Sequence, residues 1–389
     1  MKILMLCNRV PYPLKDGGVK AIDQLLRGFV TEGCQVTLAC LNTSRHHVQI
    51  KDLPAFYLNN IIFKSVEVNT DIKPIPALYN LIIGRSYNLS RFYSAEFVKL
   101  LMKLLQENEY DIIHIEGLFM CTYLAHIRKY SKARVALRSH NIEHQIWQRL
   151  AKQCKNPFKK GYINKLAHQL ERFERKQYNQ VNYNVAIAKE DLKTILKYKG
   201  EGAIWIPYGL NNFPSPKAKI PNNTIGFLGS LEWMPNINGL DWFLEKIFPE
   251  LGDNINLIIA GRNTPKRYFK LQNKNIKVLG EIDNVEAFYN KVDVVIVPLL
   301  SGSGMRIKVI EAMAYKKPII STSIGAEGIN YRNNENIIIQ DEENGFLNAI
   351  TDLIKDRDKA DKIAQKGLEH VHANFDNNQL IKKLLNHYA

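Results

Sequence analysis

Short apolar runs alternate with longer amphipathic patterns along the whole chain, and this alternation limits the folds that it can adopt. Strand and helix signals in alternation are typical of parallel sheets with helices on both faces. The expected strands are 2–7, 35–40, 111–115, 135–138, 184–188, 224–228, 256–260, 276–279, 293–297 and 318–321, and the expected helices include 19–31, 95–106, 162–180, 237–251, 285–289 and 305–315. Because one compact sheet does not hold so many strands, we predict an α/β protein with two doubly wound, Rossmann-like domains.

The boundary between the domains is predicted from residues 208–223, which contain three prolines, one glycine and four asparagines. Such residues interrupt helices and strands and form turns. We therefore expect domains at 1–207 and 224–375, joined by a linker at 208–223 and followed by an amphipathic helix within 376–389. Ligands commonly bind in the cleft between two domains of this kind.

The chain is strongly basic, with 53 Lys and Arg against 38 Asp and Glu and a net charge of +15. No nucleic-acid motif is present, so an anionic membrane face or phosphorylated substrates are the favoured partners. Residues 155–165 combine four lysines with Phe158, Tyr162 and Ile163, which fits either contact with anionic lipid or a solvated connector. The five cysteines are scattered, and no apolar run reaches 18 residues. We expect a cytoplasmic protein, with peripheral contact to the inner face of the cell membrane left open.

A glycine-containing loop opens the expected helix 305–315. Gly302 and Gly304 precede Arg306 and Lys308, and Glu311 stands one turn after Lys308. A helix N-terminus presents free N–H groups, and two cations beside it suit a diphosphate. A carboxylate on the same helix face accepts hydrogen bonds from sugar hydroxyls. The alternative is a surface Lys–Glu pair on an ordinary turn.

Two further motifs lie in the first half. Gly17 and Gly18 directly precede a helix and allow an anion to approach the backbone, without the three spaced glycines of a dinucleotide site. His140 follows the strand 135–138, and Glu116 ends the strand 111–115. Residues at the carboxyl ends of parallel strands face the ligand crevice, so His140 and Glu116 are the candidate catalytic residues. A structural role for either remains the alternative.

These motifs, with Gly280-Glu281 and the run from Pro318 to Gly328, resemble the retaining, nucleotide-sugar-dependent glycosyltransferases of the GT-B architecture. The branch that they resemble most is the family 4 glycosyltransferases of bacterial surface-polysaccharide pathways. The resemblance implies that two Rossmann-like domains face one another across a cleft, that residues 224–330 bind the nucleotide sugar and that the first domain binds a glycan or lipid-linked acceptor. It also implies that the final helix crosses back to the first domain.

The resemblance assigns roles to individual residues. The diphosphate would be bound by Gly17, Gly18, Gly229, Ser230, Arg306 and Lys308, the nucleoside by Arg262, Glu281 and Glu311, and the transferred sugar by Ser303 and Gly304. The family often has an Arg and a Lys after the glycine–serine pair, but this chain has 231–236 without either. Ser303 also stands where the first of two family glutamates is usual, so the donor sugar is not inferred.

No metal ion and no cofactor are expected. No Asp-x-Asp motif follows an expected strand, and Asp356-Arg-Asp358 lies in a late helical region. Leaving-group charge would then be stabilised by Arg, Lys and helix N-termini. Two other functions stay open, a nucleotide-sugar 2-epimerase and a non-catalytic module that binds sugar nucleotides or glycans.

Overall fold

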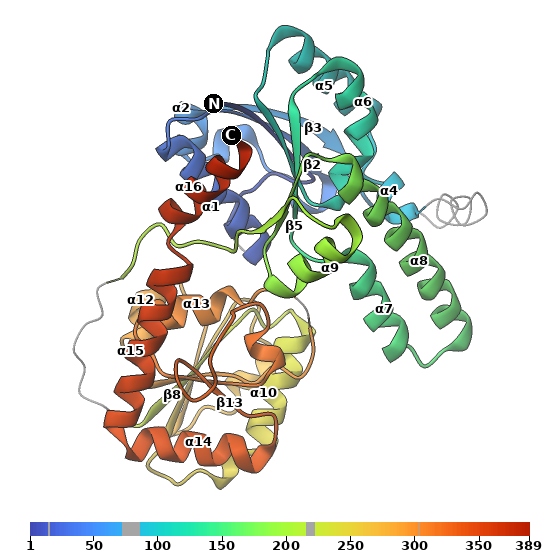
Figure 1. Cartoon of the computed structure of the whole chain (residues 1–389). Coiled ribbons are helices and arrows are strands. Elements are labelled where there is room, and N and C mark those ends of the chain that lie inside the picture. Colours follow the sequence, from blue (N-terminus) through green and yellow to red (C-terminus); the bar gives the residue numbers. More distant parts are fainter. Residues whose placement is uncertain (15, 72–85, 215–221, 303) are drawn as a thin grey trace. The chain divides into compact units, whose positions relative to one another are not determined.

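The computed structural model describes residues 1–14, 16–71, 86–214, 222–302 and 304–389. The chain divides into two compact units (Figure 1). Unit 1 comprises Met1–Gly209 and Asn377–Ala389, and unit 2 comprises Leu210–Asp376. Each unit contains a parallel sheet flanked by helices, which confirms the predicted α/β class with two doubly wound domains.

The sheet of unit 1 has seven strands in the order β3-β2-β1-β4-β5-β6-β7, and all neighbouring pairs are parallel. The strands are β1 (Lys2–Cys7), β2 (Gln35–Thr43), β3 (Ile61–Val68), β4 (Ile112–Glu116), β5 (Arg134–Ser139), β6 (Tyr183–Ala186) and β7 (Ala203–Trp205). Successive residues of β1 point to opposite faces, so Ile3 and Met5 join one apolar core while Leu4 and Leu6 join the other. Burial on both faces explains why the central strands are continuous apolar runs.

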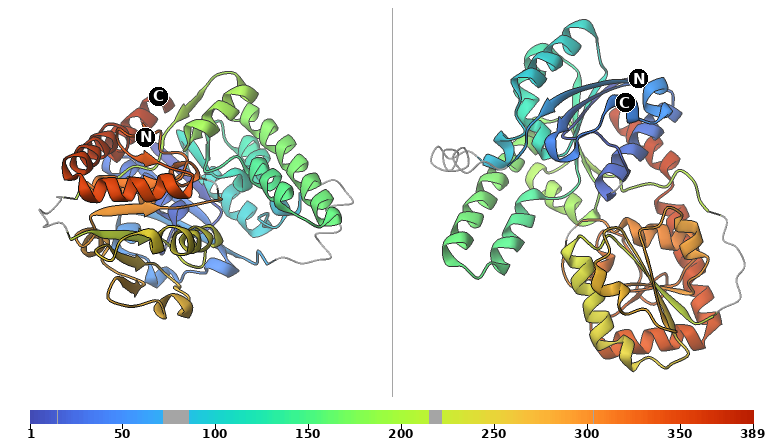
Figure 2. Two further views of the ribbon diagram at one scale, coloured as in Figure 1. Left: turned by 90° about the horizontal axis from the view of Figure 1, so that it is seen from below. Right: turned by 180° about the vertical axis from the view of Figure 1, so that it is seen from behind.

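Helices cover both faces of this sheet (Figure 2). They are α1 (Gly17–Thr31), α2 (Ala55–Asn60), α4 (Tyr87–Ser90), α5 (Ala95–Glu107), α6 (Leu124–Tyr130), α7 (Glu143–Gln153), α8 (Pro157–Gln180), α9 (Lys189–Lys199) and α16 (Asn377–Tyr388), with 3-10 turns η1 (Ser44–His46), η2 (Ile50–Asp52) and η3 (Leu118–Tyr123). Asp16 caps α1, because its side chain accepts a hydrogen bond from the Val19 N–H. The pair α7–α8 projects from the rest of unit 1 (Figure 1).

The last helix, α16, packs against α1 in unit 1, as expected from the sequence (Figure 1). Ile381, Leu384 and Tyr388 are buried in the same core as the α1 side chains. The approach is so close that a Cβ at Gly28 would lie 2.2 Å from Ile381 Cγ1, so a side chain there would displace the helix. The segment after unit 2 therefore completes the core of unit 1.

Unit 2 has a six-stranded parallel sheet in the order β10-β9-β8-β11-β12-β13. The strands are β8 (Thr224–Leu228), β9 (Asn256–Ala260), β10 (Ile276–Gly280), β11 (Val294–Val297), β12 (Ile319–Ser321) and β13 (Ile338–Ile339). The helices are α10 (Met234–Lys246), α11 (Lys266–Phe269), α12 (Val285–Tyr289), α13 (Ile307–Ala314), α14 (Glu343–Lys355) and α15 (Arg357–Asn374), with 3-10 turns η4 (Phe248–Glu250) and η5 (Ile324–Ala326). They flank the sheet on both sides (Figure 2).

Candidate functional site

The Glu116 carboxylate, at the end of β4, is fully buried in unit 1. Its Oε1 accepts hydrogen bonds from His114 Nε2 at 2.8 Å and from Arg138 Nη1 at 3.2 Å, and its Oε2 is bonded to His140 Nε2. The parallel register of β4 and β5 places Glu116 beside Arg138, so the strand ends themselves bring these groups together. The two predicted catalytic residues are therefore in direct contact.

Charge and burial act in opposite directions on Glu116. Burial alone would raise the pKa of its carboxyl, but the Arg138 guanidinium, then His140 and His114, lower it well below its usual range. Glu116 is thus a carboxylate at neutral pH. On its far side, His114 accepts a hydrogen bond of 2.7 Å from the Tyr388 hydroxyl of α16 through Nδ1. Glu116 and its neighbours hold the His140 ring, whose side chain is 21% exposed, at a fixed position.

His140 and Glu116 open into a cavity of about 440 Å³ within unit 1, here called the unit 1 pocket. Many of the side chains that line this pocket are polar or charged. They include Thr43, Arg45, Arg91, Glu116 and His140, and Gly18 also lines the pocket. Such a cavity suits a polar ligand, and it is large enough for one or two sugar rings.

The two predicted glycines do not precede the helix as expected but are the first two residues of α1. Gly18 lines the unit 1 pocket, whereas Gly17 is exposed and does not line it. A Cβ at Gly18 would lie 2.9 Å from Arg9 Nη2, which itself is 2.6 Å from Asp16 Oδ1. A side chain at Gly18 would thus press on the ion pair that closes this edge of the pocket.

Glu143 also lines the unit 1 pocket, and sequence reasoning did not select it. It begins α7 beside the buried Glu174, which accepts hydrogen bonds from the backbone N–H groups of Glu143 and His144. Burial, and then the nearby carboxylates of Glu174 and Asp191, raise the pKa of Glu143 to about 8. Its position three residues after His140 could have pointed to Glu143 as a site residue. The acidic side chains that raise its pKa could not be foreseen, because they come from α8 and α9, which are distant in the sequence.

In unit 2, the two predicted cations lie at the start of α13. Gly302 and Gly304 have φ values of 121° and 86°, which favour glycine, and they turn the chain between β11 and α13. Arg306 is the N-cap residue, so it precedes the first helical turn instead of lying within it as expected. The sequence pattern placed the start of the helix two residues early, because the glycine loop extends to Arg306.

Both cations are held by neighbouring groups. Arg306 is buried, donates to the Ile324 carbonyl at 3.3 Å and lies 5.3 Å above the centre of the Trp233 ring. Lys308 Nζ donates to Asn236 Oδ1 at 2.8 Å. Burial, and then the charge of Arg306, lower the pKa of Lys308 to about 7. An anionic ligand would stabilise the charged form of this lysine.

Asn236 connects Lys308 to the end of β8. Its Nδ2 donates to the Ser230 carbonyl at 2.8 Å, and a Cβ at Gly229 would lie 2.9 Å from the same nitrogen. The structure thus brings Gly229, Ser230 and Lys308 together through Asn236, a residue that the sequence interpretation did not select.

The remaining predicted site residues of unit 2 are more dispersed. Arg262 forms an ion pair with Glu232, so its guanidinium is already engaged. Glu281 is exposed after β10, and Glu311 lies on α13 one turn after Lys308 and is half-buried. Ser303 lies outside the described residues, next to Gly304.

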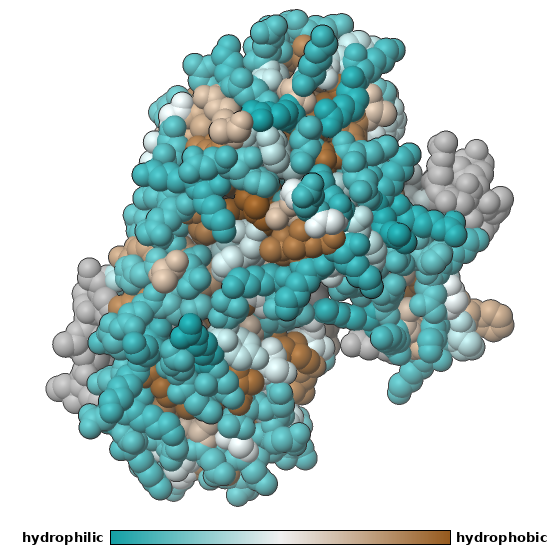
Figure 3. Space-filling model, in the orientation of Figure 1, coloured by the Kyte–Doolittle hydropathy of each residue, from teal (hydrophilic) through white to brown (hydrophobic). Residues whose placement is uncertain are grey.

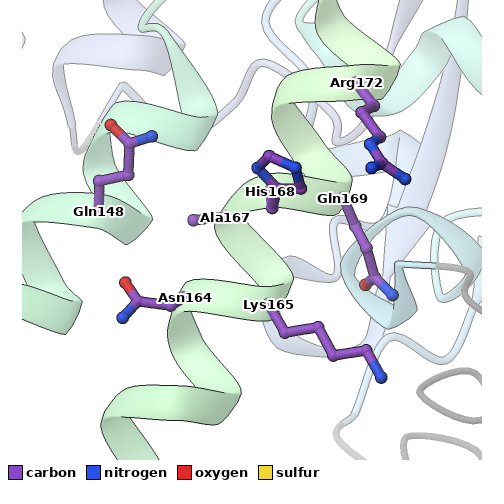
Figure 4. Close-up of a pocket in the computed structure, with 7 residues that line it drawn as sticks. All are labelled: Gln148, Asn164, Lys165, Ala167, His168, Gln169 and Arg172. Atoms are coloured by element: carbon purple, nitrogen blue, oxygen red, sulfur yellow. The ribbon is translucent and has the colours of Figure 1, made fainter.

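A second cavity of unit 1, about 620 Å³, lies along the pair α7–α8 and contains none of the predicted site residues. Gln148 comes from α7, and the six other side chains come from α8 (Figure 4). Lys165, Gln169 and Arg172 point to one side of α8, and Asn164 points to the other. Because these side chains do not point toward a common centre, we assign no catalytic role to this cavity.

Among residues 1–14, 16–71, 86–214, 222–302 and 304–389, no group of three or more His, Cys, Asp and Glu side chains forms a metal-binding cluster. None of the helices in these ranges is both long and apolar enough to span a bilayer.

Two family models match the chain. "Glycosyltransferase Family 4" matches residues 15–210, which is half of the sequence, and "Glycosyl transferases group 1" matches residues 222–356. The chain belongs to glycosyltransferase family 4. The family match, together with the two parallel-sheet domains, confirms the expected GT-B glycosyltransferase.

Individual proteins extend this comparison. An uncharacterized 44.6 kDa protein in the cps region of Klebsiella pneumoniae is 24% identical over 405 residues, covering 98% of each chain. Anabaena HepE, solved in complex with UDP, has a TM-score of 0.68 and 13% identity over 99% of each chain. The lipopolysaccharide outer core galactosyltransferase WaaB, in its apo form, has a TM-score of 0.64 and 15% identity over 100% of this chain and 99% of its own. At these identities the structures establish a shared fold.

Proposed function

We propose that this glycosyltransferase moves a sugar from a nucleoside diphosphate sugar to a glycan or lipid-linked acceptor, with retention, in the synthesis of a bacterial surface polysaccharide or lipopolysaccharide. The observation that carries the proposal is the pair of neighbouring cations Arg306 and Lys308 at the start of α13, with Lys308 tied to the end of β8 through Asn236. UDP in the HepE complex supports a nucleotide donor. The Klebsiella relative's cps region and the description of WaaB support the pathway.

In the proposed reaction, unit 2 binds the donor and unit 1 binds the acceptor. The bond between the anomeric carbon and the β-phosphate oxygen breaks, a bond to the acceptor oxygen forms on the same face, and the acceptor proton leaves with the diphosphate. Arg306 and Lys308 stabilise the charge that develops on the diphosphate, so that the reaction requires no divalent ion. His140, held by Glu116, orients the acceptor hydroxyl by a hydrogen bond.

The test is a transfer assay. Release of free nucleoside diphosphate would be measured with UDP, GDP and ADP sugars, and release of CMP with CMP sugars, each with and without glycan acceptors. We expect release that requires both substrates and falls strongly in Arg306→Ala. Arg332→Ala, which removes a guanidinium that is 73% exposed on the same unit, is the matched control. A donor that is converted without transfer to an acceptor would favour the epimerase. A donor that is bound without any conversion would favour the binding module.

The proposal includes reversible contact with anionic membranes on the cytoplasmic side, through the end of the pair α7–α8. Phe158 is 90% exposed there, and Lys155, Lys159 and Lys160 are exposed around it. Ile163, which the sequence analysis included among the apolar side chains of residues 155–165, is buried in the structure and is not available for this contact. The view in Figure 3 shows mainly hydrophilic side chains over α7 and α8, so the contact would be electrostatic with one inserted aromatic ring.

Co-sedimentation with liposomes tests this contact. Binding to anionic vesicles should fall as salt rises, because surface charges are screened within about 8 Å at physiological salt. Phe158→Ser should weaken it, whereas Leu58→Ser, at a side chain that is 52% exposed on α2, should not. Equal binding to neutral and anionic vesicles, or none to either at low salt, would contradict the contact.

A further inference from the structure

The unit 1 pocket contains two arginines whose charge no described carboxylate balances. Arg9 is paired with Asp16. Arg45 and Arg91 also line the pocket, and neither guanidinium forms a hydrogen bond or ion pair within the described residues. They are close enough that the charge of Arg45 lowers the pKa of Arg91, after the larger effect of burial.

The other titratable groups of the pocket do not neutralise the positive charge of these two arginines. The Glu116 carboxylate is matched by Arg138, which lies behind the pocket wall. Glu143 has a pKa of about 8, so its carboxyl is mainly protonated at neutral pH. Burial, and then the charge of Arg9, lower the pKa of His46, which favours its uncharged form. Two positive charges thus remain at Arg45 and Arg91.

Two buried polar atoms of the same pocket have no hydrogen-bond partner among the described residues. One is Arg91 Nε, and the other is the hydroxyl oxygen of Thr43, a residue that is only 3% exposed. Buried donors and acceptors in proteins are nearly always paired, so unpaired atoms on residues that line a cavity point to a ligand or to water. These atoms are an observation independent of the charge count.

We propose that Arg45, Arg91 and Thr43 form an anion-binding subsite of the unit 1 pocket, which takes a doubly charged phosphate or diphosphate group of the acceptor. The planar forks of two guanidinium groups match phosphate oxygens, and a single carboxylate would leave one arginine unbalanced. The hydroxyl of Thr43 donates to one of these oxygens. This inference rests on the proposed function, because it names the class of acceptor that the transferase uses.

Titration calorimetry with inorganic pyrophosphate tests the subsite without a known acceptor. Wild type should bind two equivalents, one in each unit. Arg45→Gln and Arg91→Gln should each weaken one of these sites roughly 10-fold to 100-fold, while Lys103→Gln, at an exposed charge on α5, should keep both. Arg91→Lys should restore part of the lost affinity. Two unchanged sites in both glutamine variants, with melting temperatures like that of wild type, would overturn the subsite.

The same titration separates this inference from the donor site. If Arg306→Ala retains both pyrophosphate sites, the donor site in unit 2 is wrong, whereas the subsite is overturned only by the variants of unit 1. Thr43→Val, nearly isosteric, gives a second check if an arginine variant fails to fold. It should reduce pyrophosphate affinity in unit 1, and unchanged affinity would contradict the role of the hydroxyl.

Three acceptor forms then distinguish the sources of the anion: one glycan with a free reducing end, with an anomeric phosphate, and with a diphosphate-linked prenyl chain. Arg91→Gln should raise KM for the charged forms roughly 10-fold or more and leave KM for the uncharged glycan unchanged. If the enzyme prefers only the prenyl form, the acceptor group is a lipid diphosphate. If it uses both charged forms equally, the acceptor group is a free sugar phosphate. An equal loss with all three forms would refute an anion subsite.

Discussion

Binding of a nucleoside diphosphate is expected to transfer a proton from solvent to Lys308. In the free protein, burial and then the charge of Arg306 lower the pKa of Lys308 to about 7. A diphosphate beside the amine favours the ammonium form and moves the pKa toward its ordinary value of about 10.4. At pH 8 about 90% of Lys308 is neutral before binding, so about 0.9 proton enters per nucleotide, against roughly 0.5 at pH 7 and about 0.1 at pH 6. Above pH 7 the affinity should fall about tenfold per pH unit.

Calorimetry of UDP binding in two buffers with different ionisation enthalpies measures this proton number directly. The measurement is best made at pH 8, because the terminal phosphate of UDP titrates near pH 6 and therefore contributes little to the proton uptake at pH 8. Lys308→Arg keeps a permanent charge, so its proton uptake should be near zero and its affinity nearly independent of pH between 7 and 9. Wild-type uptake of less than about 0.2 proton at pH 8 would refute the reasoning, and equal affinity in Lys308→Met would refute the contact itself.

Three further outcomes are expected. Glu116→Gln should lower turnover roughly 100-fold with little change in donor affinity, and it should reduce the free energy of unfolding by about 3–5 kcal/mol in denaturant titrations, because the buried Arg138 loses its charge partner. Leu384→Ala should reduce the free energy of unfolding by about 2–5 kcal/mol, since Leu384 is fully buried on α16, while Lys382→Ala, 65% exposed on the same helix, should change it by less than about 0.5 kcal/mol. Transfer should persist in EDTA, and a loss restored by magnesium or manganese would contradict the charge stabilisation assigned to Arg306 and Lys308.

The central strands and the edge strand β10 could be predicted from the sequence, but the edge strands β3, β7 and β13 could not. Strands β1 and β8 have the predicted bounds, because burial on both faces produces an unbroken apolar run. At these three edges, β3 has mostly half-buried and exposed residues, β7 has three half-buried residues and β13 has only two residues. Such short or mixed segments carry little apolar signal and are fixed by pairing with a neighbouring strand.

The site shows the same limit. Residues set by local chain direction, such as His140 after β5 and the glycine loop before α13, could be predicted from strand ends and turns. Asn236 and Tyr388 could not, because each reaches its partner across many residues of sequence. The pKa values of Glu143 and Lys308 also depend on burial and on side chains from other elements, which no local motif contains.

The return of α16 to unit 1 has a consequence for the order of synthesis. All of unit 2, Leu210–Asp376, leaves the ribosome before the segment that fills the core beside α1. Unit 2 has its own core and is free to fold first, whereas His114 gains its Tyr388 partner only after all of unit 2 has been synthesised. A nascent chain would therefore have a folded unit 2 before the support of His114 and Glu116 in unit 1 is complete.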